Sequence, residues 1–380
     1  MKKVLLFFVL CAIGLTAVAW IRYGGGKPYP NLSTPPLMSS ASVEEFLSYP
    51  EPIGNVAVSL DGRVFFTVHP ESRPQGNRVL EYVNGAAEPF PNMELQLEYF
   101  DTPLGIHADG FGRLWTLDHG NHGLRVPRLL GFDIETGQLI HDEAFPPHIA
   151  PAGSYLQDLR VSVDGKTIVI ADASFWRKSP ALIVYDIDSG STRRVLERDP
   201  SVVAENYLIQ TGDRKMSFLG GIVSLRGGVD AIALGPEWLY FGAISGSGLY
   251  RVRLSDLKER RLPEAQLSGR VERYATKPLA NGMAIDNNGL LYVTGIEHNS
   301  VFVIDGKREA KTLVQSADLR WPEAMAFGPD GWLYVADSAL SELLLKSPEH
   351  IRAQQPYRIF RFRPFAKDAA ESVAEEAATR

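Results

Sequence analysis

A repeated pattern restricts the fold of this chain more than any other feature of its sequence. Six copies each contain a short run of small apolar residues, a polar turn that usually ends in Gly, and an apolar run rich in aromatic residues. The first runs are residues 54–58, 104–108, 158–161, 230–234, 281–285 and 323–327. A tight turn with Gly between two apolar runs indicates a β-hairpin, so each copy predicts two antiparallel strands.

The length of the repeat indicates how the copies assemble. They begin roughly 40–70 residues apart, and a third strand often follows, as at residues 182–186 and 301–305. Repeats of this length, each a small antiparallel sheet, are typical of β-propeller blades, in which radial closure leaves few strand edges exposed. We therefore predict an all-β fold, a six-bladed β-propeller. A pair of β-sandwiches is the alternative, but it would not place the same turn in the same register six times.

The repeat also divides the chain into segments. We predict the propeller over residues 45–365, after a Gly-, Pro- and Ser-rich linker over 24–44 and before an acidic, Ala-rich tail over 366–380. Residues 119–128 and 197–228 are longer than a blade needs. Long inserts on a rigid scaffold often carry binding specificity, so we expect these two to border a site.

The N-terminal segment predicts the compartment. Lys2 and Lys3 precede an apolar run over residues 4–21, which is typical of an export signal. Over residues 1–23 we predict a signal peptide, with a small-x-small cleavage motif at 17–19, or an uncleaved membrane anchor, since about 18 apolar residues reach across a bilayer. In both cases the folded part is exported, as a secreted or periplasmic protein or one tethered to the outer face of the cytoplasmic membrane.

Composition excludes several classes of function. The formal net charge is −6 and no basic run occurs, so nucleic acid is not an expected partner. The single cysteine, Cys11, lies in the N-terminal apolar run, which leaves the rest of the chain without a disulfide framework, a CxxC zinc site or a cysteine nucleophile. No GxSxG, HExxH or P-loop motif occurs. We expect a monomer that binds a small organic molecule through carboxylates, amides, hydroxyls or histidines, and that contacts a membrane only through an uncleaved N-terminal segment.

The first strand of every copy predicts where a site would form. Inner strands line the central channel of a propeller, so the residues at their starts meet at one end of it. Polar residues at these starts are Gln157, Asp158, Asp230, Asn281 and Glu323. We predict a ligand site at this mouth. The alternative is structural, because Asp and Asn at strand starts often cap turns.

The residue types suggest roles within the predicted site. Neighbouring carboxylates perturb each other's pKa, so Asp230 or Glu323 is a candidate general base. His298 follows the second strand of its copy and is a third catalytic candidate, because a histidine can move protons near neutral pH. The candidate ligand contacts are His119, Gln157, Asp158 and Asn281.

Three aspartates occupy one shared position of the repeat, at the end of the second strand. They are Asp118, Asp172 and Asp337. A position shared across copies more often serves structure, such as bonding a neighbouring loop, than chemistry. We therefore predict a structural role for all three.

Three motifs resemble a known family. Residues 112–118 (GRLWTLD) resemble a signature of the Yellow and major royal jelly proteins, and residues 321–323 (WPE) with 330–331 (DG) are similar to their sixth-blade motif. Residues 281–286 (NGMAID) resemble the inner strand of the gluconolactonase and regucalcin clan, which has a related fold. The resemblance covers residues 45–365 and implies an exported six-bladed propeller, here a bacterial member of the family.

The resemblance also implies a choice of activities. Insect members are linked to dopachrome conversion or to binding small amines, and the wider clan contains calcium-dependent lactonases and phosphotriesterases as well as the metal-independent strictosidine synthase. For this chain the resemblance implies a dopachrome-tautomerase-like isomerase or a lactonase. A non-catalytic small-ligand binder and a scaffold for protein partners are the alternatives. In lactonase-like members oxygen ligands hold Ca²⁺, and the positions that match such ligands here are Glu51, Asp230 and Asn281.

Overall fold

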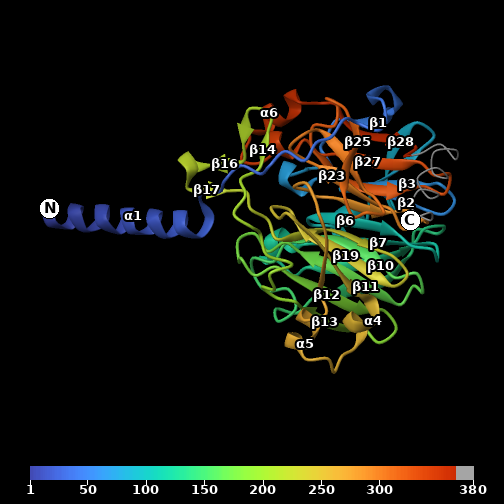
Figure 1. The fold of residues 1–380 in the computed structure, drawn as a ribbon, viewed down its shortest axis with the longest axis horizontal. Helices are drawn as coiled ribbons and strands as arrows, with labels where there is room; N and C mark the ends of the chain where they lie inside the picture. The colour runs from blue at the N-terminus through green and yellow to red at the C-terminus, as the bar shows by residue number, and fades with distance from the viewer. Residues whose placement is uncertain (365–380) are drawn as a thin grey trace.

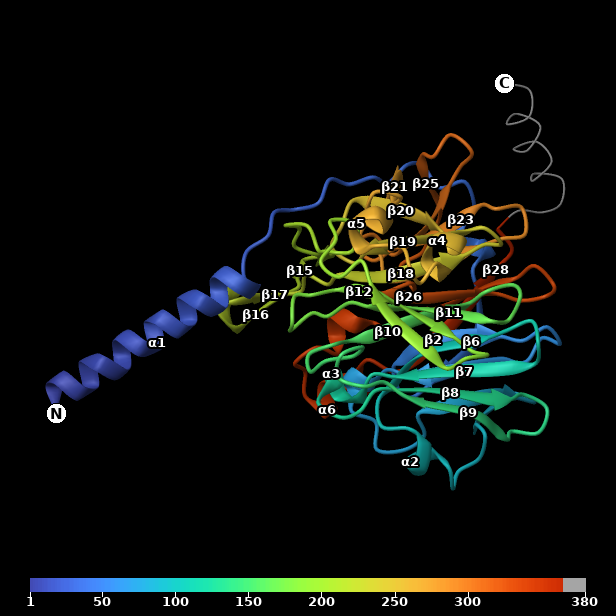
Figure 2. The same cartoon turned by 90° about the horizontal axis from the view of Figure 1, so that it is seen from below.

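The computed structural model describes residues 1–364, so the tail predicted for 366–380 lies outside the described residues. Six four-stranded antiparallel sheets follow one another around a ring (Figures 1 and 2). The inner strand of each sheet contacts the inner strand of the next, and the inner strand of the sixth sheet contacts that of the first. The chain is therefore a six-bladed β-propeller, and the predicted fold is confirmed.

Most blades take their strands in chain order from the axis outward. Blade one contains β2 (Ile53–Val58), β3 (Val64–Val68), β4 (Val79–Val83) and β5 (Ala86–Pro89). Blade two contains β6 (Pro103–Ala108), β7 (Arg113–Asp118), β8 (Arg128–Asp133) and β9 (Leu139–Ala144). Blade three contains β10 (Leu156–Val161), β11 (Thr167–Asp172), β12 (Ala181–Asp186) and β13 (Ser191–Val195). Blade four contains β18 (Val229–Leu234), β19 (Trp238–Ala243), β20 (Gly248–Arg253) and β21 (Glu272–Thr276). Blade five contains β22 (Met283–Ile285), β23 (Leu291–Gly295), β24 (Ser300–Ile304) and β25 (Ala310–Gln315).

The sixth blade closes the ring with strands from both ends of the described chain. Its inner three strands are β26 (Pro322–Phe327), β27 (Leu333–Asp337) and β28 (Tyr357–Phe362), and its outer strand is β1 (Glu44–Tyr49). β1 pairs antiparallel with β28, from Glu44 opposite Arg361 to Tyr49 opposite Tyr357. The N-terminal strand therefore fastens the last blade to the first, and no disulfide is needed for closure.

Glycines in the predicted hairpin turns have the conformation that the turns require. Five of them have φ between +68° and +85°. They are Gly62, Gly112, Gly165, Gly289 and Gly331. Residues with a Cβ rarely adopt such angles, so Gly fixes where each inner strand turns back into the second strand.

The three aspartates that share a repeat position have a structural role, as predicted, because each accepts backbone hydrogen bonds within its own blade. Asp118 accepts hydrogen bonds from the backbone N–H of Thr102 at 2.9 Å, and Asp172 accepts one from Tyr155 at 2.7 Å. Asp337 accepts one from the Trp321 N–H at 2.8 Å. In every case the donor lies directly before the inner strand of the same blade, so the carboxylate fixes where that strand begins.

The apolar core lies within and between the blades. Fully buried aromatic side chains come from several of them, among them Phe65, Phe66, Trp115, Phe241 and Tyr292. Successive side chains of a strand point to opposite faces, so a strand with a blade on either side is buried on both faces. This explains the almost unbroken apolar runs that define the repeat.

The N-terminal helix and the long insert lie on the same side of the ring (Figure 1). Helix α1 (Lys2–Tyr23) projects away from the propeller, and the insert at 197–228 folds into two small hairpins near the base of that helix (Figure 1). The hairpins are β14 (Gln210–Thr211) with β15 (Arg214–Lys215), and β16 (Ser217–Phe218) with β17 (Val223–Ser224). The segment predicted as a linker lies against the ring, since the Leu37 and Met38 N–H groups bond the outer strand of blade five at Thr312 and Leu313.

Short helices occupy the loops between strands. The α-helices are α2 (Gln96–Tyr99), α3 (Gly120–Gly123), α4 (Leu254–Lys258), α5 (Glu264–Ser268) and α6 (Pro348–Ala353). The 3₁₀ helices are η1 (Ser40–Ser42), η2 (Pro70–Ser72), η3 (Leu219–Gly221) and η4 (Leu340–Glu342). The loops with η2, α3, η3 and η4 follow second strands or belong to the long insert, and they surround one end of the channel.

Candidate functional site

A local irregularity of the inner strands turns particular side chains toward the axis. In five blades the register between the inner and second strands shifts by one residue at the start of the inner strand. The residues left without a partner are Gly54, Leu104, Gln157, Asp230 and Glu323. In blade five Asn281 lies just before the inner strand. A bulge of this kind frees its residue from the ladder, and here the freed residues meet around the axis.

These residues surround a small polar hollow, which we call the axial cluster. Its polar members are Asn55, Gln157, Asp158, Asp230, Asn281 and Glu323. The hollow measures about 10 Å³, which is room for one water-sized group. The structure therefore brings together five of the residues named from the sequence, from four different blades, although their chemical roles stay predictions.

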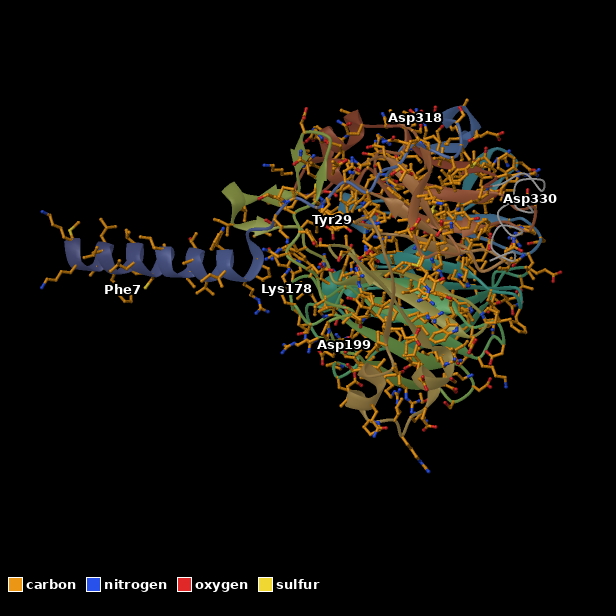
Figure 3. All side chains as sticks on the ribbon, viewed as in Figure 1. Phe7, Tyr29, Lys178, Asp199, Asp318 and Asp330 are labelled. Carbon is orange, nitrogen blue, oxygen red and sulfur yellow. The ribbon has the colours of Figure 1, made fainter. Side chains whose placement is uncertain are left out.

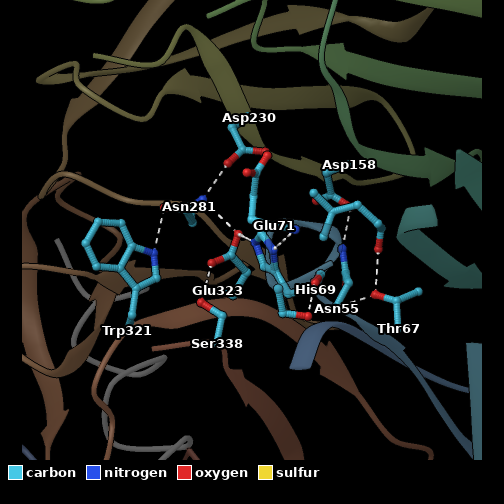
Figure 4. Close-up of polar contacts among 12 residues, drawn as sticks. Asn55, Thr67, His69, Glu71, Asp158, Asp230, Asn281, Trp321, Glu323 and Ser338 are labelled. Atoms are coloured by element: carbon cyan, nitrogen blue, oxygen red, sulfur yellow. Dashed lines mark hydrogen bonds and ion pairs between the residues drawn. The ribbon is translucent and has the colours of Figure 1, made fainter. Parts of the chain in front are cut away.

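Asn281 lies at the centre of the cluster (Figure 4). Its Nδ2 donates to Asp230 Oδ2 at 2.9 Å and to Glu323 Oε1 at 3.1 Å. On the other side Glu323 Oε2 accepts from the Ser338 hydroxyl at 2.7 Å. One amide thus joins the carboxyl groups of blades four and six.

The orientation of the Asn281 amide bears on the calcium prediction. Trp321 Nε1 lies 3.1 Å from Asn281 Oδ1, and an indole N–H is only a donor, so the amide oxygen faces Trp321. The nitrogen therefore faces both carboxyl groups, in the position from which an oxygen would bind Ca²⁺. In this arrangement Asn281 does not fit as a calcium ligand, and the described residues contain no group of three or more His, Cys, Asp or Glu side chains placed to hold a metal.

Burial perturbs the acids of the cluster. Burial first, and then the nearby Glu323 and Asp158 carboxylates, raise the pKa of Asp230 well above its usual range. Burial also raises the pKa of Asp158, although Arg160, whose Nη1 lies 2.6 Å from Asp158 Oδ1, opposes that rise. Asp230 therefore keeps its proton at a pH where an exposed aspartate is ionised.

A larger cavity opens beyond the cluster, and we call it the entrance cavity. It has a volume of about 290 Å³ and shares Gln157 and Asn281 with the cluster. Its polar floor consists of His69, Glu71, His122, Tyr155, Gln157 and Asn281. Its wall is apolar and includes Phe175, Trp176, Phe218, Leu219, Leu225 and Leu345. Phe218, Leu219 and Leu225 belong to the 197–228 insert, and His122 belongs to the 119–128 insert, so both inserts border the cavity as expected.

The floor holds a linked set of histidines and one glutamate. His122 Nε2 lies 2.9 Å from Glu71 Oε1, and the His122 ring stacks on Tyr155 with centroids 4.5 Å apart. Burial acts to raise the pKa of Glu71, but its hydrogen bond to His122 and its interactions with the surrounding histidines outweigh burial and lower that pKa to about 2. Glu71 is therefore a carboxylate at neutral pH.

His69 presents an unpaired nitrogen to the cavity. Its Nδ1 accepts from the Glu71 backbone N–H at 3.2 Å, so in the neutral ring the proton is on Nε2. That nitrogen is buried without a hydrogen-bond partner among the described residues, 3.7 Å from Glu323 Oε1. Gln157 Oε1 is likewise buried and unpaired. The floor thus offers one free donor and one free acceptor.

Three residues predicted for the site lie elsewhere. Glu51 lines neither the cluster nor the entrance cavity. The axial position of its blade is occupied instead by Gly54, where a Cβ would come within 2.7 Å of the Leu104 side chain. His298 lies in the turn after β23, while Ile296 takes the buried position that follows the strand. His119 is 1% exposed, behind Tyr155 and His122, and lines neither space.

The sequence analysis does not name His69 and Glu71, because they follow a second strand and an alignment on the starts of the inner strands leaves them out. Aligned instead on the ends of the second strands, His69, His119 and Ser338 occupy one position, directly after β3, β7 and β27. These ends lie at the same end of the channel as the inner-strand starts. The sequence therefore contained a signal for His69, and Glu71 follows it closely.

The fold and the site define a class of protein: a six-bladed β-propeller with an acid–amide cluster at its axis and a cavity above it. A family model described as major royal jelly protein matches residues 102–359. The chain belongs to the major royal jelly protein family, which confirms the resemblance drawn from its motifs.

Individual relatives are distant. The chain is 26% identical over 208 residues to major royal jelly protein 3 of Apis mellifera, which is 51% of this chain and 36% of that protein. It is 26% identical over 211 residues to major royal jelly protein 7 of the same species, which is 52% of this chain and 45% of that protein. The chain thus matches less than half the length of these relatives.

Solved structures show the same fold at low identity. A gluconolactonase from Xanthomonas campestris aligns with a TM-score of 0.55 and 13% identity, over 90% of this chain and 97% of that one. A regucalcin from Agrobacterium tumefaciens, described as a calcium-binding protein, aligns with a TM-score of 0.54 and 14% identity, over 87% and 95% of the two chains. These likenesses support the propeller architecture alone.

Proposed function

We propose that this protein is an exported propeller that binds a small organic molecule in the entrance cavity and transfers a proton within it. The ligand has an apolar body and one polar end. Family membership supports the scaffold, and the apolar N-terminal helix, as a signal peptide or an anchor, supports export. The cavity wall is apolar and the floor is polar, which supports this shape of ligand.

The observation that carries the proposal is the pair of unpaired polar atoms in the floor. Gln157 Oε1 and His69 Nε2 are both buried without hydrogen bonds among the described residues. A buried polar group left without a partner costs about 1–3 kcal/mol, and a ligand hydroxyl or carbonyl would recover that free energy. The floor is therefore suited to a polar group that both donates and accepts.

Groups in different protonation states support proton transfer. Asp230 has a raised pKa and keeps its proton, so it can donate one, whereas Glu71, with a pKa of about 2, is a weak base and instead orients the His122 ring, which can accept a proton. Tautomerisation and lactone opening both need one group that accepts a proton and another that donates one. Since Asp230 and Glu323 lie beneath Asn281, only a small polar end that enters the axial hollow would reach them.

The experiment compares two matched substitutions. L-dopachrome is chosen as one probe because insect members of the family are linked to dopachrome conversion. Glucono-δ-lactone is chosen as the other because a structural neighbour is named a gluconolactonase. Gln157→Leu removes the free acceptor, so we expect kcat/KM for the active probe to fall at least about tenfold, which is about 1.4 kcal/mol. Gln138→Leu, the same change at an exposed position, should leave the rate unchanged.

Stability separates a functional role of Gln157 from a structural one. Removing a buried, unpaired polar group should leave the melting temperature unchanged or raise it, because no hydrogen bond is lost. A Gln157→Leu variant with wild-type turnover would overturn the proposal. Binding of either probe without turnover, measured by equilibrium dialysis, would favour the non-catalytic binder instead.

A further inference from the structure

Apart from its last turn, helix α1 packs against nothing in the described part of the protein, and none of its residues is buried. It is 22 residues long with a mean hydropathy of 2.7 in its most apolar window, and none of that window is buried. A helix of this length extends about 33 Å, which is enough to cross a hydrocarbon core of about 30 Å. Figure 3 shows its side chains, including Phe7, projecting into open space away from the propeller. A bilayer is the environment that such a surface fits.

The C-terminal end of α1 is bonded to the wall of the entrance cavity. The Tyr23 hydroxyl donates to the Trp176 carbonyl at 2.8 Å, and Arg22 Nη2 donates to the Arg177 carbonyl at 2.8 Å. The Tyr23 ring also contacts the rings of Phe175 and Trp176, with centroids 6.2 and 5.7 Å apart. These contacts hold the end of the helix against the cavity wall, so a membrane around α1 would begin at that wall.

The mouth of the cavity is apolar and exposed. Three of its lining residues form what we call the rim patch: Trp176 is 47% exposed, Leu219 is 67% exposed and Leu345 is 76% exposed. Leu124 and Val126, which follow the cavity residue His122 in the same insert, are 73% and 61% exposed. Apolar side chains of this kind gain free energy when they enter the boundary between headgroups and acyl chains.

Basic side chains lie at the same level. Arg22 is in the last turn of α1, and Lys178 Nζ lies 4.1 Å from the centre of the Phe175 ring and donates to the Arg226 carbonyl at 3.1 Å. Burial lowers the pKa of Lys178 to about 7, so Arg22 is the full positive charge at this level. Figure 3 places Lys178 beside the base of the helix. Tyrosine and tryptophan favour the membrane interface, and basic residues there attract anionic headgroups.

We propose that α1 stays attached to the mature protein and that the rim patch rests in the outer leaflet of the membrane, so that the entrance cavity opens toward lipid. The partner is a bilayer with anionic lipid. This inference does not depend on the proposed ligand or on turnover, because it follows from the helix and its contacts with the cavity wall.

The test uses the full chain and measures how deeply labelled side chains of the rim patch enter a bilayer. In a Cys11→Ser background, single cysteines Leu219→Cys and Leu345→Cys are labelled with bimane and reconstituted into phosphatidylcholine vesicles with about a third phosphatidylglycerol. Nitroxides on the lipid chains should quench both labels severalfold more than a label at Val163→Cys. Val163 is a matched control, since it is 69% exposed and lies in the turn at the opposite end of blade three.

Two results would overturn the inference. One is equal quenching at positions 219, 345 and 163, which would mean that the rim patch stays in water. The other is a mature protein, isolated from its host without selecting a membrane or soluble fraction, whose mass lacks residues 1–19. Neither result bears on probe turnover, so this inference and the proposed function can fail separately.

Discussion

Asn281 shows how one donor can decide what a cluster binds. The Trp321 indole fixes the amide with its oxygen away from the carboxyl groups, so the cluster is held by hydrogen bonds from Asn281 Nδ2. Replacing that nitrogen by oxygen would leave four acids, at positions 158, 230, 281 and 323, around one hollow. Such a set is destabilised without a cation and suits Ca²⁺ with one.

We therefore expect Asn281→Asp to melt at a lower temperature than the wild type in EDTA and to regain stability in millimolar Ca²⁺. A cation that binds the folded state raises its melting temperature. Since the Asn281 oxygen faces Trp321 and leaves no calcium site, the melting temperature of the wild type should differ by less than about 1 °C between EDTA and Ca²⁺. Thermal denaturation followed by circular dichroism measures both. A clear rise in the melting temperature of the wild type in Ca²⁺ would instead support the calcium prediction. It would mean that the Asn281 amide rotates so that its oxygen faces the cation.

His119 makes stability depend on pH. Burial, and then the neighbouring His122, lower the pKa of His119 to about 3, whereas an unfolded histidine titrates near 6.5. Below pH 6.5 the unfolded chain binds a proton that the folded chain does not, so stability is lost as the pH falls from 6.5 toward 3. Between pH 7 and pH 5 this amounts to about 2 kcal/mol.

His119→Asn should remove this part of the pH dependence. Its side chain can still accept from the His122 N–H, as His119 Nδ1 does at 2.9 Å. Urea denaturation at pH 7 and pH 5 should therefore show a smaller difference for the variant than for the wild type. Equal differences would contradict the assignment of a buried, neutral imidazole.

At the scale of single residues, the sequence predicted where the axial side chains lie better than how they are oriented and bonded. Gln157, Asp158, Asp230, Asn281 and Glu323 meet because strand starts converge in a propeller, and that convergence follows from the repeat alone. The orientation of the Asn281 amide depends on Trp321, a neighbour that only the folded structure supplies. His69 was missed for a similar reason, since its role depends on loops that follow second strands.

At the scale of elements, the aspartates at the ends of three second strands decide where the inner strands of those blades begin. Asp172 is fully buried and accepts from the Tyr155 and Ser174 N–H groups and from Arg194 Nη1 at 2.7 Å. It thereby links the inner, second and outer strands of blade three. The sequence predicted this structural role from the shared position, but not the arginine, because Arg194 lies on the irregular fourth strand.

Asp172→Ala should destabilise the protein by about 3–5 kcal/mol, because it removes the buried carboxylate 2.7 Å from Arg194 Nη1 and leaves that guanidinium only Glu197 at 3.4 Å. Asp330→Ala is the control, since Asp330 lies in an exposed turn of blade six. It should change the free energy of unfolding by less than about 1 kcal/mol. Urea denaturation gives both values, and similar losses for the two variants would contradict a specific role for Asp172.

At the scale of the whole molecule, closure depends on β1. Leu47 is 4% exposed and packs in the core shared by blades one and six, whereas Glu45 on the same strand forms an exposed ion pair with Arg358 at 2.7 Å. The repeat predicted six blades but not which strand completes the sixth. The reason is that β1 lies before the first recognisable copy and has no turn of its own.

Leu47→Ala should therefore cost about 2–5 kcal/mol, as other large-to-small changes in a core do. Glu45→Ala should cost at most about 1 kcal/mol, since exposed ion pairs contribute little. Differential scanning calorimetry of the two variants measures the difference. A Leu47→Ala protein as stable as Glu45→Ala would mean that the first strand does not hold the ring closed.

The bulges at the starts of the inner strands have a consequence for how such a protein can change. A bulge residue takes no part in strand pairing, so exchanging it leaves the register of its blade intact, although at Gly54 a Cβ would press on the Leu104 side chain. The axis is thus a set of exchangeable positions, one in each of the five bulged blades, on a frame whose strand pairing does not depend on them. New chemistry can arise there by single substitutions, one blade at a time, while the architecture is inherited unchanged.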